Sequence, residues 1–294
     1  MTRLKNEHLI RLATYGAVGV ASILVCIKTY AWYVSGSLSI QASLIDSSLD
    51  ACASLVNFFA LRHALRPADA DHRFGHGKAE SLSSLGQSVF IAIASIWIAK
   101  EVIYRTAHPE PFVFNSTTLI VMVFASFLTL MLILGQQYVI KRTGSLGISA
   151  DSLHYKTDFL TDLSVLGSFF ISTYFGWRWF DTLVGALIAL YIFHSSWRIA
   201  KDAFDVLMDK ELPPDILARI TAIVLQNPEV LGVHDLRTRT SGQYKFIQLH
   251  LDLDEALSFK EAHRISEDVM NAINTEFPDA EVLVHQDPIL TTKE

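Results

Sequence analysis

Six long apolar stretches constrain this chain more than any other feature of its sequence. A hydrocarbon core about 30 Å thick requires about 20 mostly apolar residues in each helix that crosses it. The sequence predicts six such spans, at residues 9–34, 38–61, 81–104, 117–140, 148–175 and 179–199. The first is too long for the apolar core of a signal peptide, so we expect it to be retained. The chain is therefore expected to fold around a bundle of six membrane helices.

Basic residues in the loops predict how this bundle is oriented, because Lys and Arg concentrate on the cytoplasmic side of membrane helices. One side of the predicted bundle holds Arg3, Lys5, Arg62, Arg66, Arg73, Lys78, Lys141, Arg142, Lys201 and Lys210. The other side has little beyond Arg105 and Arg178. We therefore expect both termini in the cytoplasm, as six spans also require.

The last third of the chain has a different pattern. The predicted order is a helix opened by Pro213-Pro214-Asp215, strands at 230–239 and 245–254, a helix from 259 to about 273, and a strand at 281–286. Ser258 and Glu261 have the spacing of a capping box at the start of the second helix. The fold class is thus an α-helical membrane protein with a six-span transmembrane bundle (1–208), followed by a small α+β domain of order αββαβ (209–294).

Composition narrows the class of protein further. Charged residues make up 18% of the chain, against about 25% in soluble proteins. The net charge of −6 argues against a nucleic-acid partner. The two cysteines, Cys26 and Cys52, lie inside apolar runs, so neither a disulfide framework nor a thiolate zinc site is expected.

Ionisable residues inside the predicted spans are the strongest functional signal, because charge at membrane depth is costly. Asp46 and Asp50 share one face of the second span, and His154 and Asp158 share one face of the fifth. If these faces meet, three carboxylates and one imidazole form a complete tetrahedral shell for a divalent cation. Such ligands suit Zn²⁺, Fe²⁺, Mn²⁺, Co²⁺ or Cd²⁺ better than Cu⁺. The simpler alternative, that these groups only satisfy one another, is disfavoured because two such pairs occur on separate spans.

The same ligands suggest an energy source for transport. Metal binds only when the imidazole is neutral and the carboxylates are ionised, so metal ions and protons compete for one site. Free imidazole titrates near pH 6.5, within the physiological range. Protons that enter could therefore drive metal out, which is a hypothesis at this point.

Other ionisable residues of the spans have simpler interpretations. Asp162, one turn beyond Asp158, could extend a proton path, although a polar neighbour is slightly favoured. Lys28, Lys100 and Glu101 lie near outer helix ends, where we expect them to snorkel to the membrane surface. His194 is expected to be a packing residue.

Several separated motifs together resemble the cation diffusion facilitator family, and in particular its bacterial zinc and ferrous-iron efflux pumps. The motifs are Ser-Leu-Ile-Asp46-Ser-Ser-Leu-Asp50, Asp-Ser-Leu-His154-Tyr-Lys-Thr-Asp158, Phe74-Gly-His76-Gly-Lys78-Ala-Glu80 and His285-Gln286-Asp287-Pro288. The resemblance covers nearly the whole chain. It implies a homodimeric Zn²⁺/H⁺ antiporter of the inner membrane that works by alternating access, with its transport site at Asp46, Asp50, His154 and Asp158.

Residues between the second and third spans form a second candidate site. Asp69, His72 and His76 could wrap a cation on a glycine-containing loop, although a plain polar loop is an equal alternative from spacing alone. The resemblance favours ligands, because family members bind zinc at matching positions. Asp71 could replace Asp69 as the acidic ligand. The resemblance also implies a charge interlock between Lys78 and Asp209, although an exposed pair of little energetic value is the alternative.

Histidines in the tail form a third candidate site. Strand alternation places His250 away from the apolar face, and His285 shares a face with Asp287. A lone histidine of this kind would usually be a solvated surface residue. The set of His234, His250, His263, His285 and Asp287 instead predicts a binuclear metal site. The resemblance implies that zinc there supports the dimer of cytoplasmic domains.

The sequence disfavours two other classes of protein relative to a transporter. A zinc-dependent intramembrane hydrolase would need an open ligand position, and neither a His-Glu-x-x-His nor a Gly-x-Ser-x-Gly motif is present. A sensor with a membrane anchor would have no use for carboxylates inside its spans. Both alternatives are disfavoured.

Overall fold

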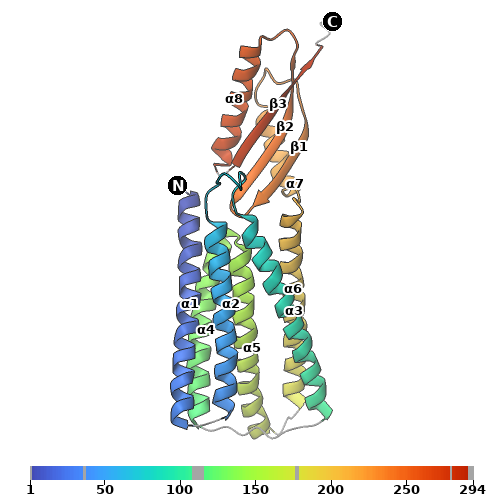
Figure 1. The fold of residues 1–294 in the computed structure, drawn as a ribbon. Helices are drawn as coiled ribbons and strands as arrows, with labels where there is room; N and C mark the ends of the chain where they lie inside the picture. Colours follow the sequence, from blue (N-terminus) through green and yellow to red (C-terminus); the bar gives the residue numbers. More distant parts are fainter. Residues whose placement is uncertain (1, 36–37, 108–115, 176–178, 279, 291–294) are drawn as a thin grey trace. The chain divides into compact units, whose positions relative to one another are not determined.

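The computed structural model describes residues 2–35, 38–107, 116–175, 179–278 and 280–290. Its long helices are α1 (Thr2–Ser35), α2 (Leu38–Ala64), α3 (Lys78–Ala107), α4 (Ser116–Thr143), α5 (Leu146–Phe175) and α6 (Trp179–Leu207) (Figure 1). Each contains one predicted span, and the mostly helical fold class is confirmed. The helices extend past the predicted spans because a helix continues beyond the hydrocarbon core.

Five helices of the described chain, α1, α2, α3, α4 and α6, are long and apolar enough to cross a membrane. The exception, α5, is 30 residues long but contains four charged side chains in its first two thirds, Asp151, Lys156, Asp158 and Asp162. Ionisable residues at membrane depth are rare and functional. The charged residues of α5 therefore make this helix the one to examine for a site.

Four of the membrane helices form a bundle. α1 packs against α2 and α4, and α5 packs against α4 and α2. Buried apolar side chains from all four meet in one cluster, Ile10, Leu61, Val139 and Ile148. Gly147 brings the start of α5 close to α2, since a Cβ there would lie 2.8 Å from Cδ2 of Leu61. This packing places the polar faces of α2 and α5 side by side.

Helices α3 and α6 approach one another where a Cβ on Gly185 would lie 2.7 Å from Cγ2 of Val102. Ile91, Leu153 and Ile192 join this pair to α5. Many large apolar side chains of the pair are exposed, among them Ile93, Trp97, Leu187 and Leu190. Exposed apolar surface on long helices is what a lipid environment requires.

The tail has the predicted αββαβ order. Its elements are α7 (Pro214–Val224), β1 (Gly232–Ser241), β2 (Tyr244–Asp254), α8 (Phe259–Glu276) and β3 (Ala280–Ile289). The sheet order is β1-β2-β3, with β1 antiparallel and β3 parallel to β2. The apolar residues of β2, Ile247, Leu249, Leu251 and Leu253, pack in one buried cluster with residues of α7 and α8. The other sheet face is left for polar side chains.

Local sequence signals explain where the tail elements begin and turn. Ser258 accepts a hydrogen bond from the backbone N–H of Glu261, whose side chain accepts one from the backbone N–H of Ser258. This capping box starts α8 as predicted. The turn from β1 to β2 contains Gly242 at φ 59°, a conformation that glycine adopts at little cost.

The chain divides into two compact units, one formed by Met1–Pro67 and Ala79–Phe204 and the other by Ala68–Lys78 and Asp205–Glu294. The short segment after α2 thus packs with the tail, although the sequence prediction groups it with the membrane domain. The ring of Phe74 contacts that of Phe246, with centroids 5.6 Å apart. A side chain on Gly77 would collide with the backbone carbonyl of Ser241. These contacts fix the segment against the sheet.

Candidate metal centres

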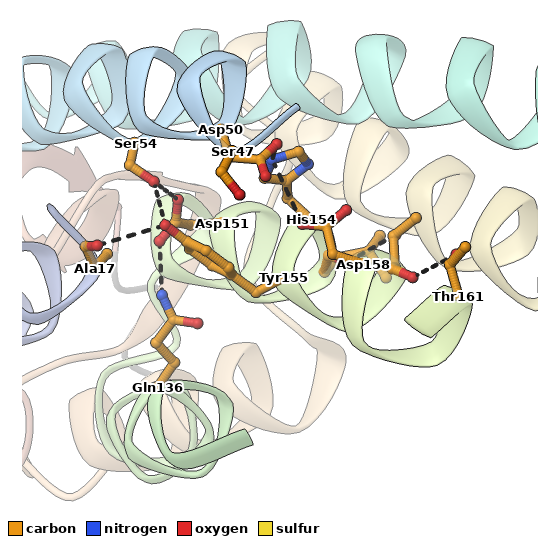
Figure 2. Close-up of polar contacts among 12 residues, drawn as sticks. Ala17, Ser47, Asp50, Ser54, Gln136, Asp151, His154, Tyr155, Asp158 and Thr161 are labelled. Atoms are coloured by element: carbon orange, nitrogen blue, oxygen red, sulfur yellow. Dashed lines mark hydrogen bonds and ion pairs between the residues drawn. The ribbon is translucent and has the colours of Figure 1, made fainter. Parts of the chain in front are cut away.

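The polar faces of α2 and α5 bring three of the four predicted membrane ligands together. Nε2 of His154 lies 2.9 Å from Oδ1 of Asp50 and 3.9 Å from Oδ2 of Asp158. One ligand atom from each residue lies within 4.8 Å of the others, and Figure 2 shows the side chains directed toward one another. Oδ2 of Asp158 is buried and has no hydrogen-bond partner among the described residues. A cation held at this point would satisfy that oxygen.

Asp46 lies near this group without joining it. It lines the same cavity of about 350 Å³ as the other three residues, but it is exposed and outside the cluster of closely spaced ligand atoms. Asp46 is one helical turn from Asp50, so a small change in how α2 and α5 pack would alter its distance from the imidazole. The fourth predicted ligand is therefore adjacent to the cluster in this structure.

Sequence interpretation missed a buried carboxylate in the same bundle. Asp151 is 2% exposed; its carboxylate accepts hydrogen bonds from Nε2 of Gln136 at 2.6 Å and from Oγ of Ser54 at 3.5 Å. Ser54 also shares a hydrogen bond of 2.7 Å with the hydroxyl of Tyr155 (Figure 2). The sequence does contain a sign of this residue's position, because Asp151 is three residues before His154 and both therefore lie on one face of the helix.

The membrane-surface position expected for Lys28 is wrong. The residue is 9% exposed, and its Nζ donates hydrogen bonds to Oγ of Ser47 at 2.6 Å and to the carbonyl of Ser43 at 3.3 Å. Lys28 lines the same cavity as the candidate ligands. Helix α2 offers these two acceptors on the side that faces α1, so the ammonium group is held inside the bundle.

Two further ionisable residues, Asp162 and Lys100, each have a nearby partner outside the cluster around His154. Asp162 lines the cavity and accepts a hydrogen bond of 3.3 Å from Oγ of Ser126. Lys100 is exposed, with its ammonium 5.0 Å from the ring centroid of Trp97. Neither belongs to the cluster around His154.

The segment after α2 brings Asp69, His72 and His76 together. Oδ1 of Asp69 lies 3.5 Å from Nδ1 of His72, and Oδ2 of Asp69 lies 3.3 Å from Nε2 of His76. Backbone N–H groups of His72 and Asp71 donate to Oδ1 of Asp69, and the first of these bonds does most to lower the pKa of this carboxyl below its ordinary value. Asp69, rather than Asp71, is the carboxylate among the closely spaced ligand atoms. The group offers two imidazoles and one carboxylate, which is a set that divalent zinc accepts.

Three histidines of the tail lie side by side on the exposed sheet face. Register pairs His234 with His250, and His250 with His285, on adjacent strands. Oδ2 of Asp287 lies 2.7 Å from Nδ1 of His250 and 3.3 Å from Nε2 of His234, while Oδ1 lies 3.3 Å from Nε2 of His285. The hydrogen bond from His250 is the main reason why the pKa of Asp287 lies below its ordinary value. Asp287 can therefore bridge two cations by its two oxygens.

His263 lies apart from this cluster within one chain. It is on α8, is exposed, and lies 3.4 Å from Oε1 of Glu267 and stacked against Phe259. Among the described residues, no contact joins it to His234, His250 or His285. Conversely, Asp252 was missed: its Oδ1 lies 3.1 Å from Nδ1 of His234, and it pairs with Asp287 in the register of β2 and β3.

The predicted pair of Lys78 and Asp209 is in contact, with Nζ 2.9 Å from Oδ1. Arg239 also reaches Oδ1 of Asp209, at 3.3 Å, and its guanidinium lies over the rings of Phe74 and Phe246. Partial burial raises the pKa of Asp209, but the hydrogen bond and charge of Lys78, with Arg239, outweigh it and hold this pKa below its ordinary value. The pair therefore joins the segment after α2 to the tail.

Comparisons with known proteins agree with these observations. The cation efflux transmembrane domain matches residues 15–208, and the cytoplasmic domain of cation efflux proteins matches residues 212–289. The cation-efflux pumps FieF of Yersinia pestis (strain Pestoides F) and of Yersinia pseudotuberculosis (serotype O:3, strain YPIII) are each 43% identical over 279 residues, which covers 95% of this chain and 93% of theirs.

A solved structure titled "Mode of Action of a Putative Zinc Transporter CzrB" is 32% identical and covers 26% of this chain and 98% of its own, with a TM-score of 0.26. That score is too low to support an inference about fold. The family models and the FieF pumps confirm the resemblance that the sequence motifs predict. The chain belongs to the cation efflux family and is a membrane transporter that exports metal cations.

Proposed function

We propose that this transporter exchanges Zn²⁺ for protons at a site built from Asp46, Asp50, His154 and Asp158. The observation that carries the proposal is the convergence of Asp50, His154 and Asp158 within the membrane bundle, with one carboxylate oxygen left unsatisfied. A carboxylate and imidazole set without sulfur favours Zn²⁺ and related ions. Fe²⁺, Cd²⁺, Co²⁺ and Mn²⁺ are further candidate substrates.

Proton coupling follows from the identity of the ligands. Each carboxylate and the imidazole can bind either a proton or the metal ion, so an incoming proton displaces the metal. The residues of this chain hold or release protons at Oδ atoms of the aspartates and at Nε2 of His154. Proton entry on one side of the membrane and metal entry on the other would then give antiport.

Alternating access requires that α2 and α5 change their packing, and two features support this. Asp46 lies outside the close group although it lines the same cavity. Small residues such as Gly147 allow the two helices to approach closely. We propose that Asp46 joins the shell in another packing state of the bundle, and that access switches between the two sides at this step.

The protein is proposed to act as a homodimer in the inner membrane, with both termini in the cytoplasm. The distribution of Lys and Arg supports this orientation. The matching cytoplasmic family model, which has the short name ZT_dimer, supports the dimer. Zinc held by His234, His250, His285 and Asp287, with His263, would stabilise the association of cytoplasmic domains, and zinc held by Asp69, His72 and His76 would form a further site.

A flux measurement tests the proposal. The purified protein is reconstituted in liposomes, and uptake of radioactive zinc is measured with and without an opposing proton gradient. Zinc flux should increase with the gradient and be lost in Asp50→Ala, whereas His194→Ala, on exposed α6 surface, serves as the matched control. If zinc flux is the same with and without the proton gradient, proton coupling is refuted. Normal zinc flux in Asp50→Ala would refute the assignment of the transport site to these residues.

A further inference from the structure

Lys28 is a cation fixed inside the cavity that contains the candidate transport site. Its side chain is 9% exposed, and its ammonium donates hydrogen bonds to Ser47 and Ser43 on α2. Ser47 directly follows Asp46 and is three residues before Asp50. The helix that supplies two of the proposed ligands therefore also fixes this positive charge in place.

A buried lysine requires an explanation, because its long side chain can usually extend to the membrane surface. The alternative partner in the cavity is Asp162, whose carboxylate accepts a hydrogen bond from Ser126 on α4. The hydrogen bonds of Lys28 are instead made to α2, beside the proposed ligands. The ammonium thus lies beside the metal site, and its charge acts on both Asp46 and Asp162.

The charge of the proposed site leaves a role for such a cation. Three ionised carboxylates and one neutral imidazole carry three negative charges, and a divalent ion cancels two of them. One negative charge would remain inside the membrane, where uncompensated charge is costly. A fixed ammonium in the same cavity brings the summed charge of the four ligands, the divalent ion and Lys28 to zero; Asp162, further along the cavity, is not counted in this sum.

We propose that Lys28 is the counter-charge of the metal-loaded site and that it sets the preference of the transporter for divalent over trivalent cations. The inference rests on the proposed transport site. With Lys28 present, a divalent ion brings the summed charge of the four ligands, the ion and the ammonium to zero, and a trivalent ion leaves this group with an excess positive charge. Without Lys28, a trivalent ion brings the summed charge of the ligands and the ion to zero, and a divalent ion leaves an excess negative charge.

Removal of the lysine charge should separate binding from transport. Lys28→Met should bind both kinds of ion more tightly, because a repulsive cation is lost. The affinity for Tb³⁺ should increase by about tenfold more than that for Cd²⁺, the size expected from one unit charge in a protein interior. The rate of zinc transport should fall, because the zinc-loaded site of the variant carries a net charge inside the membrane while the bundle changes from one access state to the other.

The test is titration of the purified full-length protein with Cd²⁺ and with Tb³⁺. The portion of binding that Asp50→Ala removes is assigned to the transmembrane site, and Trp97, which lines the cavity, provides a sensitiser for Tb³⁺ luminescence. Lys28→Arg keeps the charge and should restore the wild-type ratio of affinities. Lys141→Met, which removes an exposed lysine at the end of α4 and away from Trp97, is the matched control.

Ser47→Ala distinguishes a charge effect from a structural one, because it removes the hydrogen bond at 2.6 Å and leaves the ammonium. If Ser47→Ala changes the Tb³⁺/Cd²⁺ ratio as Lys28→Met does, or if Lys28→Met weakens both ions or leaves the ratio unchanged, the inference is overturned. If Asp50→Ala removes no binding and no zinc flux from the wild-type background, the proposed transport site itself fails.

Discussion

Two clusters of this chain use the same ligand chemistry in opposite surroundings. In the membrane bundle, the side chains of Asp50 and His154 are 17% and 16% exposed. On the tail sheet, those of His234 and His285 are 51% and 63% exposed. Water can solvate the second cluster in any charge state, whereas we propose that the first depends on protons, a metal ion and Lys28 for charge balance. The same residue types are therefore expected to couple metal to protons in one place and to hold metal passively in the other.

The scaffolds of the two clusters differ as well. Strand register fixes His234, His250 and His285 side by side, and the sheet behind them packs on a continuous apolar core. The proposed membrane ligands lie on two helices, and their spacing depends on how α2 and α5 pack. A rigid sheet suits a structural ion, whereas a pair of helices that can move suits release of a transported ion.

The largest expected effect comes from removal of one histidine from each cluster. His154→Ala should reduce zinc flux by at least about 100-fold, since loss of a ligand exceeds the 10–100-fold typical of its supporting partners. His250→Ala should retain most of the flux and lose the increase in thermal stability that zinc gives to the folded state. Liposome flux and thermal melts with and without a chelator measure the two quantities. Equal loss of flux in both variants would remove the distinction between the clusters.

Smaller effects are expected from the buried polar network of the bundle. Asp151→Ala leaves the amide of Gln136 buried without its acceptor, which should cost about 1–3 kcal/mol of unfolding free energy. Unfolding in detergent by increasing sodium dodecyl sulfate measures it, with the exposed Glu255→Ala as the control. A value no different from the control would show that the network contributes nothing to the bundle.

A comparable change in the tail should cost less. Ser258→Ala removes the side-chain cap of α8, which is expected to lower stability by about 1 kcal/mol. Thr275→Ala, near the other end of the same helix, provides a matched substitution that leaves the cap intact. Thermal melts of the two variants are compared, and an equal melting temperature would contradict the importance of the cap.

The smallest expected effect is a loss of stability at low pH that depends on Asp209. Because the pKa of Asp209 is held below its ordinary value of 3.8, its contribution to stability is complete above that value and is lost as pH falls through the lowered pKa. The pair with Lys78 is partly exposed, so the contribution should be at most about 1 kcal/mol. Asp209→Asn should remove this portion of the acid dependence in thermal melts between about pH 4 and about pH 2. An unchanged slope would show that the pair is energetically neutral.

Sequence patterns predicted the elements of this protein well, because long apolar runs, the capping box at Ser258 and strand alternation around His250 are local signals. The pairs at Asp46 and Asp50 and at His154 and Asp158 also identified the polar faces of α2 and α5. What the patterns could not provide was which faces meet. Spacing in one helix does not show that Asp46 lies outside the close group, because that depends on the packing between two helices.

The remaining differences have the same origin. Lys28 was expected at the membrane surface, but acceptors on a neighbouring helix hold it inside. Asp151 was overlooked because its partner, Gln136, comes from another helix. Asp69 was distinguished from Asp71 only by the folded turn, in which backbone N–H groups orient one carboxylate toward the histidines. His263 was grouped with the tail cluster by residue type, and its ligand atoms lie outside the close group of His234, His250 and Asp287 within one chain.

The most direct test of the central claim is the initial rate of zinc flux through Asp158→Ala, measured in liposomes beside His285→Ala and the unaltered protein. Asp158 contributes the unsatisfied oxygen of the membrane cluster, whereas His285 belongs to the exposed cluster of the tail. Flux is predicted to vanish in Asp158→Ala and to persist in His285→Ala, with both variants folded. Full zinc flux in Asp158→Ala would contradict the claim that the transported ion passes through the ligands on α2 and α5.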